Sequence, residues 1–333
     1  MKIENYFVRQ REIDEMYMRR CLQLARLGWQ GAPPNPMVGA VLVCDGRIIG
    51  EGYHRRCGEA HAEVNAINSV RQPELISRST IYVSLEPCAH YGKTPPCAQL
   101  IIDQKIPRVV VGCQDPFARV DGRGITMLRD AGIDVIVGVL EEECLWLNRR
   151  FITFHTLGRP YITLKWAQSK DGFIDRERNN FTIPPVTFST PTTQALVHQL
   201  RAENESIVVG HRTWELDKPS LTVRHWHGRN PLRFVIGQTT KGETKKNTSE
   251  VKWAKSPEAL VKELAESGVQ TLLVEGGAQT LQSFIDAGLW DEARIETASF
   301  NLNEGVKAPR IEGREGEKLL IDGNSIHFIY KIS

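Results

Sequence analysis

"GEAHAEVNAI" (residues 58–67) places His61 and Glu63 two positions apart at the start of a predicted helix that runs to about residue 70. On a regular helix, residues i and i+2 point about 200° apart, so Glu63 should not bind a metal ion held by His61. At a helix end, both side chains can still reach one pocket from different sides. The pair is therefore either a metal ligand beside an acid/base or two polar side chains on a helix surface, and other segments must decide.

The segments around this helix alternate between strand and helix patterns. Residues 37–44 and 47–54 are apolar strand-like runs joined by Asp45-Gly46, a typical hairpin turn. A hairpin followed by a βαβα series predicts an α/β fold with one mixed sheet and helices on both faces. Further strands are expected at 80–86, 108–113 and 134–140, and further helices at 14–28, 95–104 and 124–132.

A chain of 333 residues exceeds what one compact core usually serves, so two domains are expected. The polar, basic segment 147–160 is predicted to be the linker, which gives α/β domains at 1–155 and 156–333. Residues 238–252 have the composition of a solvated loop. The second domain has predicted strands at 160–169, 206–210, 232–237, 269–277, 291–300 and 325–332, and predicted helices at 190–203, 256–267 and 278–288.

The composition excludes several classes of protein. Hydrophobic residues make up 41% and charged residues 25%, which is typical of a globular enzyme and not of a disordered chain. The net charge of +2 gives no electrostatic reason to expect nucleic acid or a membrane as partner. Seven cysteines and a charged amino terminus without an apolar signal core predict a cytoplasmic protein without a disulfide framework. We also expect a homo-oligomer.

Two thiols complete the pattern around His61. Cys88 and Cys97 flank "AHYGKTPP" (89–96) after a predicted strand. One imidazole and two thiolates are three ligands, the number that a catalytic zinc uses while its fourth position is left to water. A carboxylate such as Glu63 can take the proton of that water and pass a proton to departing ammonia. The pattern H-x-E…P-C…C is the zinc-deaminase signature, here with eight residues between the cysteines in place of two.

Each of these residues also has an ordinary explanation. A single histidine is usually a hydrogen-bonded structural residue, a pair of cysteines is usually core, and a glutamate usually lies on a solvated helix face. Their joint occurrence favours a catalytic zinc site. A structural zinc site would need a fourth protein ligand, for which Cys57 and His90 are nearby, although neither has the customary spacing.

Several motifs resemble the bifunctional riboflavin-biosynthesis deaminase/reductase family, RibD or RibG. They include "PPNPMVGAVLV" (33–43), "GEGYH" (50–54), "SLEPCAHYGKTPPC" (84–97) and "LNRRF" (147–151). The resemblance implies a cytidine-deaminase-like amino-terminal domain. It also implies a small phosphorylated substrate, 2,5-diamino-6-(5-phosphoribosylamino)pyrimidin-4-one, which loses its 2-amino group by hydrolysis and becomes 5-amino-6-(5-phosphoribosylamino)uracil.

The resemblance also assigns residues in the first domain. The zinc ligands are His61, Cys88 and Cys97, with Glu63 as the proton shuttle. Asn35 matches the family's asparagine that contacts the pyrimidine. Residues matching the loop that approaches the ribosyl phosphate are His90 and Lys93.

The carboxy-terminal domain of this family resembles dihydrofolate reductase and transfers hydride from NADPH to the ribosyl C1′, which opens the sugar to a ribityl chain. "VEGG" (274–277), between a predicted strand and a predicted helix, is a turn suited to a cofactor phosphate, whereas the G-x-G-x-x-G pattern of a Rossmann domain is absent. By correspondence, the cofactor contacts are Ala167, Thr213, Asp217, Gly277, Ala278, Gln279, Thr280, Leu281, Gln282 and Ser283. The substrate contacts are Lys165, Arg201, Leu221, Arg224 and Glu275, with Arg201 and Arg224 as a bidentate phosphate clamp.

The second half departs from the family's pattern at several places, including "VIGQ" (235–238) in place of the usual "VID" and a short loop after it. Lys218 stands after Asp217 where the family has Asp or Asn, and "IPPVTFST" (183–190) replaces a tryptophan-containing stretch that normally lines the cofactor site. One alternative is therefore a deaminase whose second domain is inactive or only structural, which an NADPH titration would reveal. A nucleic-acid-editing deaminase is the other alternative, and the near-neutral charge and the long cysteine gap disfavour it.

Overall fold

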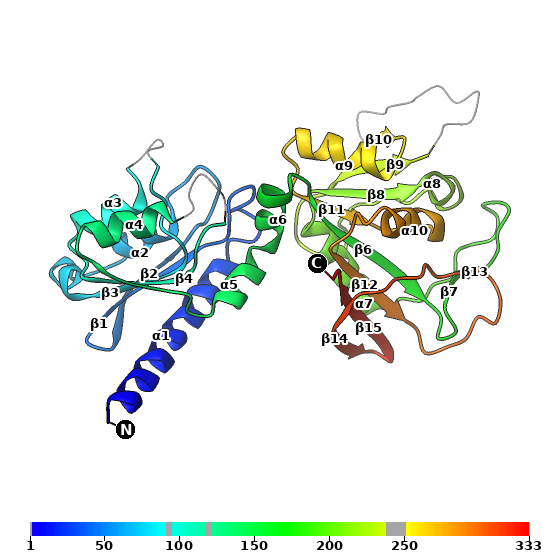
Figure 1. The fold of residues 1–333 in the computed structure, drawn as a ribbon. Helices are drawn as coiled ribbons and strands as arrows, with labels where there is room; N and C mark the ends of the chain where they lie inside the picture. Colours follow the sequence, from blue (N-terminus) through cyan, green and yellow to red (C-terminus); the bar gives the residue numbers. More distant parts are fainter. Residues whose placement is uncertain (1, 91–94, 117–121, 238–250, 333) are drawn as a thin grey trace. The chain divides into compact units, whose positions relative to one another are not determined.

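The chain folds as two compact units, Met1–Leu157 and Gly158–Ser333 (Figure 1). The computed structural model describes residues 2–90, 95–116, 122–237 and 251–332. Each unit is built on its own sheet and has its own hydrophobic core on both faces of that sheet.

The first unit contains a five-stranded mixed sheet in the order β2-β1-β3-β4-β5. The hairpin strands β1 and β2 pair antiparallel through the Asp45-Gly46 turn, β1 also pairs antiparallel with β3, and β3, β4 and β5 are parallel. The predicted mixed sheet is therefore confirmed. The strands are β1 Gly39–Cys44, β2 Arg47–Tyr53, β3 Thr80–Leu85, β4 Arg108–Cys113 and β5 Asp134–Val137.

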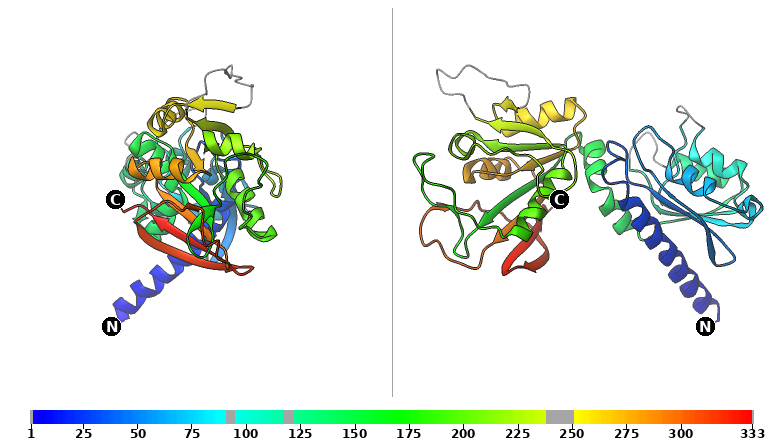
Figure 2. Two further views of the ribbon diagram at one scale, coloured as in Figure 1. Left: turned by 90° about the vertical axis from the view of Figure 1, so that its right-hand side faces the viewer. Right: turned by 180° about the vertical axis from the view of Figure 1, so that it is seen from behind.

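Helices cover both faces of this sheet (Figure 2). Alternate residues of β3 point to opposite faces, so Ile81 packs toward α2, α3 and α4 while Tyr82 packs toward α1 and α5. The predicted stripe on the first helix is confirmed, since Met18 and Cys21 are fully buried. The helices are α1 Lys2–Arg26, α2 Ala62–Asn68, α3 Cys97–Asp103, α4 Arg123–Asp130, α5 Glu141–Leu147 and α6 Arg149–Leu157, with a 3₁₀ helix, η1, at Pro73–Arg78.

The second unit has an eight-stranded sheet in the order β10-β9-β8-β11-β6-β12-β15-β14, parallel except at β15, which pairs antiparallel with both of its neighbours. The short strands β7 and β13 form a separate antiparallel pair. The strands are β6 Tyr161–Gln168, β7 Phe173–Asp175, β8 Ser206–Gly210, β9 Leu232–Ile236, β10 Val251–Ala254, β11 Thr271–Val274, β12 Glu292–Thr297, β13 Val306–Lys307, β14 Arg314–Ile321 and β15 Asn324–Tyr330.

Four helices accompany this sheet: α7 Pro191–Ala202, α8 His211–Asp217, α9 Pro257–Glu266 and α10 Ala278–Asp286. Leu260 of α9 and Phe284 of α10 pack on one face, and Leu200 of α7 packs on the other. The helices α8 and α10 follow the carboxyl ends of the parallel strands β8 and β11. This edge of a parallel sheet is where α/β proteins usually bind ligands.

The structure corrects three expectations. The predicted linker 147–160 is largely helical, because α6 occupies Arg149–Leu157. The predicted loop 238–252 ends in a strand, since β10 begins at Val251, while residues 238–250 lie outside the described part of the chain. The sequence analysis also missed η1, α5, β7, α8, β13 and β14, which are short or, in β14, mostly exposed and so lack a clear apolar period.

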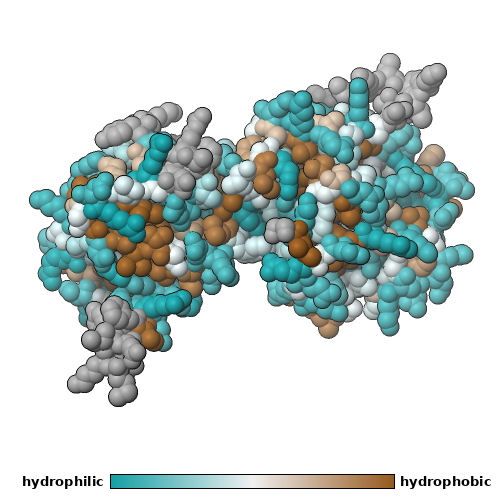
Figure 3. Space-filling view, viewed as in Figure 1, coloured by the Kyte–Doolittle hydropathy of each residue, from teal (hydrophilic) through white to brown (hydrophobic). Residues whose placement is uncertain are grey.

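Polar side chains cover most of the visible surface of both units (Figure 3). Within the described residues, no helix combines the length and the apolar character that crossing a bilayer requires.

Candidate functional site

A cluster of three potential metal ligands lies in the first unit. The His61 imidazole and the Cys88 and Cys97 thiols have ligand atoms within 4.8 Å of one another. The His61 Nδ1 lies 3.6 Å from Cys88 Sγ and 3.4 Å from Cys97 Sγ. Tetrahedral zinc with Zn–S near 2.3 Å and Zn–N near 2.0 Å would place nitrogen and sulfur about 3.5 Å apart. Both observed nitrogen–sulfur distances therefore fit a zinc ion.

The starts of α2 and α3 supply His61 and Cys97, and the loop that follows β3 supplies Cys88. His61 is the N-cap residue of α2, one position before the predicted first turn, with an extended backbone at φ −70° and ψ 168°. Cys97 is the first residue of α3, after Pro96, and its backbone N–H donates to Cys88 Sγ at 3.3 Å. The Ala98 N–H donates to the Cys88 carbonyl, which fixes the loop to the start of α3. Unpaired N–H groups at helix starts favour thiolates.

The charges of the cluster suit a cation. The hydrogen bond with the Cys97 thiol lowers the pKa of Cys88 to about 4 against the opposing effect of burial, and His61 lowers it further. The same hydrogen bond raises the pKa of Cys97, because the two thiols share one negative charge. A divalent cation removes this competition, since it stabilises both thiolates.

Glu63 lies beside the cluster and not in it. Its side chain is 3% exposed, and burial raises its pKa to about 7, with the charge on Cys88 as the next contribution. A hydrogen bond links it to Cys97. Among the described residues, the metal-ligand cluster contains only His61, Cys88 and Cys97, so the structure brings Glu63 to the site without making it a ligand.

Asn35 lies in the same region, held by a histidine that the sequence analysis missed. His54 is 3% exposed, and burial lowers its pKa. Its Nδ1 lies 3.2 Å from the Ala60 carbonyl, which only accepts, so the Nδ1 carries the hydrogen. The Nε2 then accepts from the Asn35 Nδ2 at 3.1 Å. With its Nδ2 bound to His54, Asn35 can offer its Oδ1 as an acceptor to the N–H of a ligand.

His54→Phe should therefore weaken substrate binding without releasing metal. The ring is kept, so its edge-on contact with the His61 ring, at 5.4 Å between centroids, can persist, but both hydrogen bonds are lost. We expect KM for the deaminase substrate to rise about 5- to 10-fold, measured as ammonia release against substrate concentration. His54→Gln should recover part of the loss. An unchanged KM in His54→Phe would show that Asn35 needs no such support.

The two loop residues assigned to the ribosyl phosphate are only partly described. His90 follows Cys88 by two residues in the sequence and is exposed. Lys93 lies outside the described residues.

The second unit contains a cavity of about 790 Å³ at the carboxyl ends of β6, β8 and β11. Its wall carries six cationic side chains and three anionic ones, which suits anionic ligands such as a dinucleotide and a phosphorylated sugar. Most of the predicted reductase residues line it. They are Ala167, Thr213, Asp217, Gly277, Ala278, Gln279, Thr280 and Leu281 for the cofactor, and Lys165, Arg201, Arg224 and Glu275 for the substrate.

The start of α10 is shaped for close approach of a phosphate. Gly277 has φ +67°, and a Cβ there would lie 3.0 Å from Thr213 Oγ1. Any other residue would be strained and would narrow the space between α8 and α10. Residues 277–281, at the start of this nine-residue helix, line the cavity, and the unpaired N–H groups of a helix start can bind a cofactor phosphate. These residues fit NADPH.

An ion pair forms the substrate side of the cavity. Arg201 donates to Glu275 from Nε at 2.8 Å and from Nη2 at 2.6 Å, and its Nη1 donates to the Thr222 carbonyl. Arg224 is exposed and donates from Nη1 to the hydroxyls of Ser220 and Thr222. The bidentate phosphate contact predicted for Arg201 would use the Nε and Nη2 atoms of its guanidinium group. These atoms are the ones that donate to Glu275. Burial lowers the pKa of Lys165.

Three predicted contacts do not lie in the cavity wall. The Leu221 side chain is 1% exposed and packs in the core with Leu200, because a positive φ of 53° turns it inward. Gln282 is on another face of α10, where it binds Asp286 and the backbone of Arg310. Ser283 donates to the Thr280 carbonyl within the helix.

The sequence analysis missed several residues of the cavity wall, and two of them bear directly on the site. His198 is 5% exposed and accepts the Arg224 N–H on Nδ1 at 2.9 Å, and burial lowers its pKa to about 4, so the ring is neutral at pH 7. Arg178 is the other. Lys218, whose role was open, places its ammonium 5.4 Å from the centre of the Phe181 ring, outside the cavity wall.

Comparison with known proteins agrees with this geometry. Residues 11–113 match the family described as the cytidine and deoxycytidylate deaminase zinc-binding region, and residues 160–318 match the RibD C-terminal domain. The riboflavin biosynthesis protein RibD of Aquifex aeolicus is 37% identical over 325 residues, which cover 89% of this chain and 90% of the relative. The RibD of Bacillus amyloliquefaciens is 36% identical over 95% of this chain and 92% of its own length.

Solved structures give the same result. RibD of Acinetobacter baumannii superimposes with a TM-score of 0.86 and 27% identity, covering 97% of this chain and all of the other. A diaminohydroxyphosphoribosylaminopyrimidine deaminase/5-amino-6-(5-phosphoribosylamino)uracil reductase of Thermotoga maritima superimposes with a TM-score of 0.85 and 32% identity over the same shares. The chain belongs to the RibD family of riboflavin biosynthesis and carries both of its activities, a zinc-dependent deaminase and an NADPH-dependent reductase.

Proposed function

We propose that the chain deaminates 2,5-diamino-6-(5-phosphoribosylamino)pyrimidin-4-one and then reduces the ribosyl group of the product, 5-amino-6-(5-phosphoribosylamino)uracil. The observation that carries this proposal is the cluster of His61, Cys88 and Cys97 with the buried Glu63 beside it. The Thermotoga maritima relative is described by the same two activities.

In the deaminase, His61, Cys88 and Cys97 would hold the zinc ion. Zinc supplies the Lewis acidity that makes water a nucleophile near neutral pH. Glu63 moves the protons: its carboxylate takes one from the attacking water and delivers one to the 2-amino nitrogen. A C–O bond forms at C2, the C–N bond breaks, and ammonia leaves. Glu63 suits this role because it is buried beside the ligand cluster and is hydrogen-bonded to Cys97 without being a ligand.

Burial of Glu63 also supports this role, because a carboxylate kept from bulk water exchanges its proton with the substrate and not with solvent. Asn35 orients the ring through its Oδ1, with His54 holding the amide in place. His90 and Lys93 would approach the ribosyl phosphate.

In the reductase, the start of α10 and Thr213 would bind the cofactor, and Arg201, Arg224, Lys165 and Glu275, which line the same cavity, would surround the substrate. NADPH supplies the hydride for C1′. The buried Lys165 lies near Glu275, which partly offsets the cost of burying its charge. Ring opening of the sugar requires a proton at the ring oxygen, and Lys165, on β6 in the cavity wall, is the residue that we assign as its donor.

The test is to incubate the chain with the diaminopyrimidine ribosyl phosphate and NADPH and to follow both products by mass. Ammonia release together with NADPH oxidation supports the proposal. Ammonia release with no saturable NADPH binding would instead support a deaminase with an inactive second domain, and a gel shift with tRNA would reopen the editing alternative. A homo-oligomeric state and a cytoplasmic location stay predictions.

A further inference from the structure

One wall of the reductase cavity is formed by residues 175–189, here called the wall segment, which run from the last residue of β7 through a stretch without helix or strand. Both of its ends line the cavity: Asp175, Arg176 and Arg178 at one end, and residues 185–189 at the other. It contains the stretch that replaces the tryptophan-containing sequence of the family. The question is therefore what holds this segment in place.

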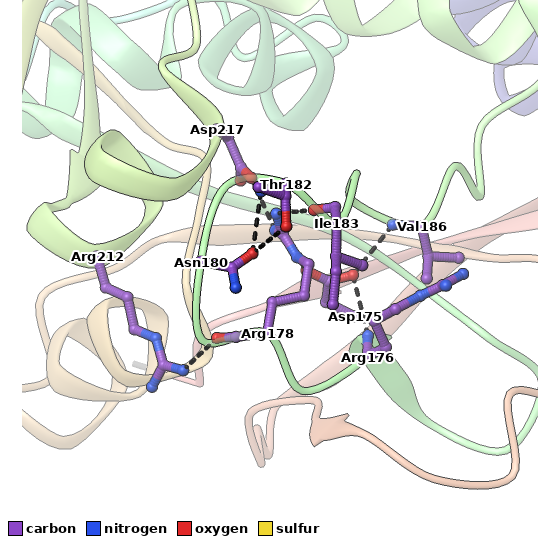
Figure 4. Close-up of polar contacts among 9 residues, drawn as sticks. All are labelled: Asp175, Arg176, Arg178, Asn180, Thr182, Ile183, Val186, Arg212 and Asp217. Carbon is purple, nitrogen blue, oxygen red and sulfur yellow. Dashed lines mark hydrogen bonds and ion pairs between the residues drawn. The ribbon is translucent and has the colours of Figure 1, made fainter.

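Arg178 is the centre of the contacts at the first end (Figure 4). Its side chain is 4% exposed, although it carries a charge. It donates to Asp175 Oδ2 from Nε at 2.7 Å and from Nη2 at 2.6 Å, and to Asp217 Oδ1 from Nη2 at 2.7 Å. Its Nη1 reaches the Ile183 carbonyl at 3.3 Å, and its own carbonyl accepts from Arg212 Nη2 at 2.9 Å.

These contacts join three parts of the unit. Asp175 ends β7 and also accepts from the Val186 N–H at 3.0 Å, so it ties the start of the wall segment to its later part. Asp217 ends α8, and Arg212 belongs to the same helix. Arg178 therefore attaches the wall segment to α8 through both its side chain and its backbone. The other end is fixed separately, because Ser189 donates to Glu296 on β12 at 2.6 Å.

Arg178 also determines how Asp217 is presented. The Asp217 Oδ1 is taken by Arg178, and among the described residues no hydrogen bond takes Oδ2. The carboxylate is thus fixed in rotation, with one oxygen left for a hydroxyl or amide donor. A carboxylate held in this way loses less side-chain freedom when a ligand binds.

We propose that Arg178 is a positioning residue for the reductase cofactor: it docks the wall segment on α8 and turns Asp217 so that one carboxylate oxygen is free to accept from NADPH. This inference rests on the proposed reductase function. Lysine could not do the same, because a single ammonium lacks the planar fork that reaches Asp175 and Asp217 together.

The experiment compares Arg178→Met with the wild-type chain. We expect the Kd for NADPH, from fluorescence titration, and the KM for NADPH to rise roughly 10- to 100-fold. The kcat at saturating NADPH should fall much less. The Kd and KM for NADPH of Arg178→Lys should lie between those of the wild type and those of Arg178→Met. A residue with only a structural role would reduce the folded fraction, which lowers kcat and leaves KM unchanged.

The chain offers two controls. Ammonia release by the first unit should stay within about twofold, because that unit has its own core. Arg229→Met removes an exposed arginine of the same unit that does not line the cavity, and it should bind NADPH like the wild type. If Arg178→Met unfolds the second unit, the test uses Asp175→Asn and Arg178→Lys instead. The Kd for NADPH must then rise in both of these variants.

The outcomes separate this inference from the function on which it rests. Wild-type NADPH binding together with an unchanged Kd in folded Arg178→Met would overturn the role of Arg178 alone. A fall in kcat at constant KM would overturn it as well. If the wild-type chain itself bound no NADPH, the reductase proposal would fall, and the role of Arg178 with it.

Discussion

Glu63→Gln should lower the rate of ammonia release by roughly 10²- to 10⁴-fold while the chain keeps one zinc ion. Glutamine has nearly the same shape, so the packing around this buried position is preserved. It cannot take a proton from water or deliver one to the departing nitrogen. The zinc content should not change, because Glu63 lies outside the ligand cluster. Ammonia release and bound zinc are measured on the same preparation.

A matched control is Glu59→Gln, four residues upstream. The Glu59 side chain is 52% exposed and makes only a long contact of 3.9 Å with Arg56, so its loss should leave the rate within about twofold. In addition, Glu63→Gln should oxidise NADPH normally when it is given the deaminated substrate. If Glu63→Gln released ammonia at the wild-type rate, the proton shuttle would have to be another group.

The structure brings His61, Cys88 and Cys97 into the cluster that the sequence predicts, because these residues lie in short local patterns. His61, Glu63 and Cys97 all lie at helix starts, where the sequence separation fixes their approximate geometry, and the strand before Cys88 has a clear apolar pattern. His54 was missed because a lone histidine after a strand has no distinguishing spacing. Its role depends on Asn35, which lies 19 residues away in the sequence.

The reductase site was predicted less completely, for reasons of geometry. A contiguous range, 277–283, was assigned to the cofactor, but each helical residue turns by about 100°, so Gln282 and Ser283 point elsewhere. Leu221 was assigned to the substrate, but its left-handed backbone turns the side chain into the core. Arg178 lies in a segment with no periodic pattern, and its partner Asp217 is 39 positions away.

Cys97→Ala should abolish zinc binding at micromolar metal and reduce ammonia release by at least about 100-fold. The substitution removes one of three protein ligands, and it leaves Cys88 and His61 to hold the ion alone. Cys97 is also the residue that joins the cluster to α3, through its N–H to Cys88 Sγ. This backbone bond survives in alanine, so the loop should keep its position and only the metal should be lost. Zinc per chain and ammonia release are measured together.

Cys57→Ala is the matched control and also decides between a catalytic and a structural zinc ion. Cys57 is exposed, close in sequence to His61, and outside the ligand cluster of the described residues. If zinc used it as a fourth ligand, its loss would lower the metal content. We expect full zinc content and full activity, because a catalytic ion keeps its fourth position for water.

Chelation of the wild-type chain should stop ammonia release but leave reduction of the deaminated substrate unchanged. Full deamination by metal-free protein would contradict the proposed mechanism.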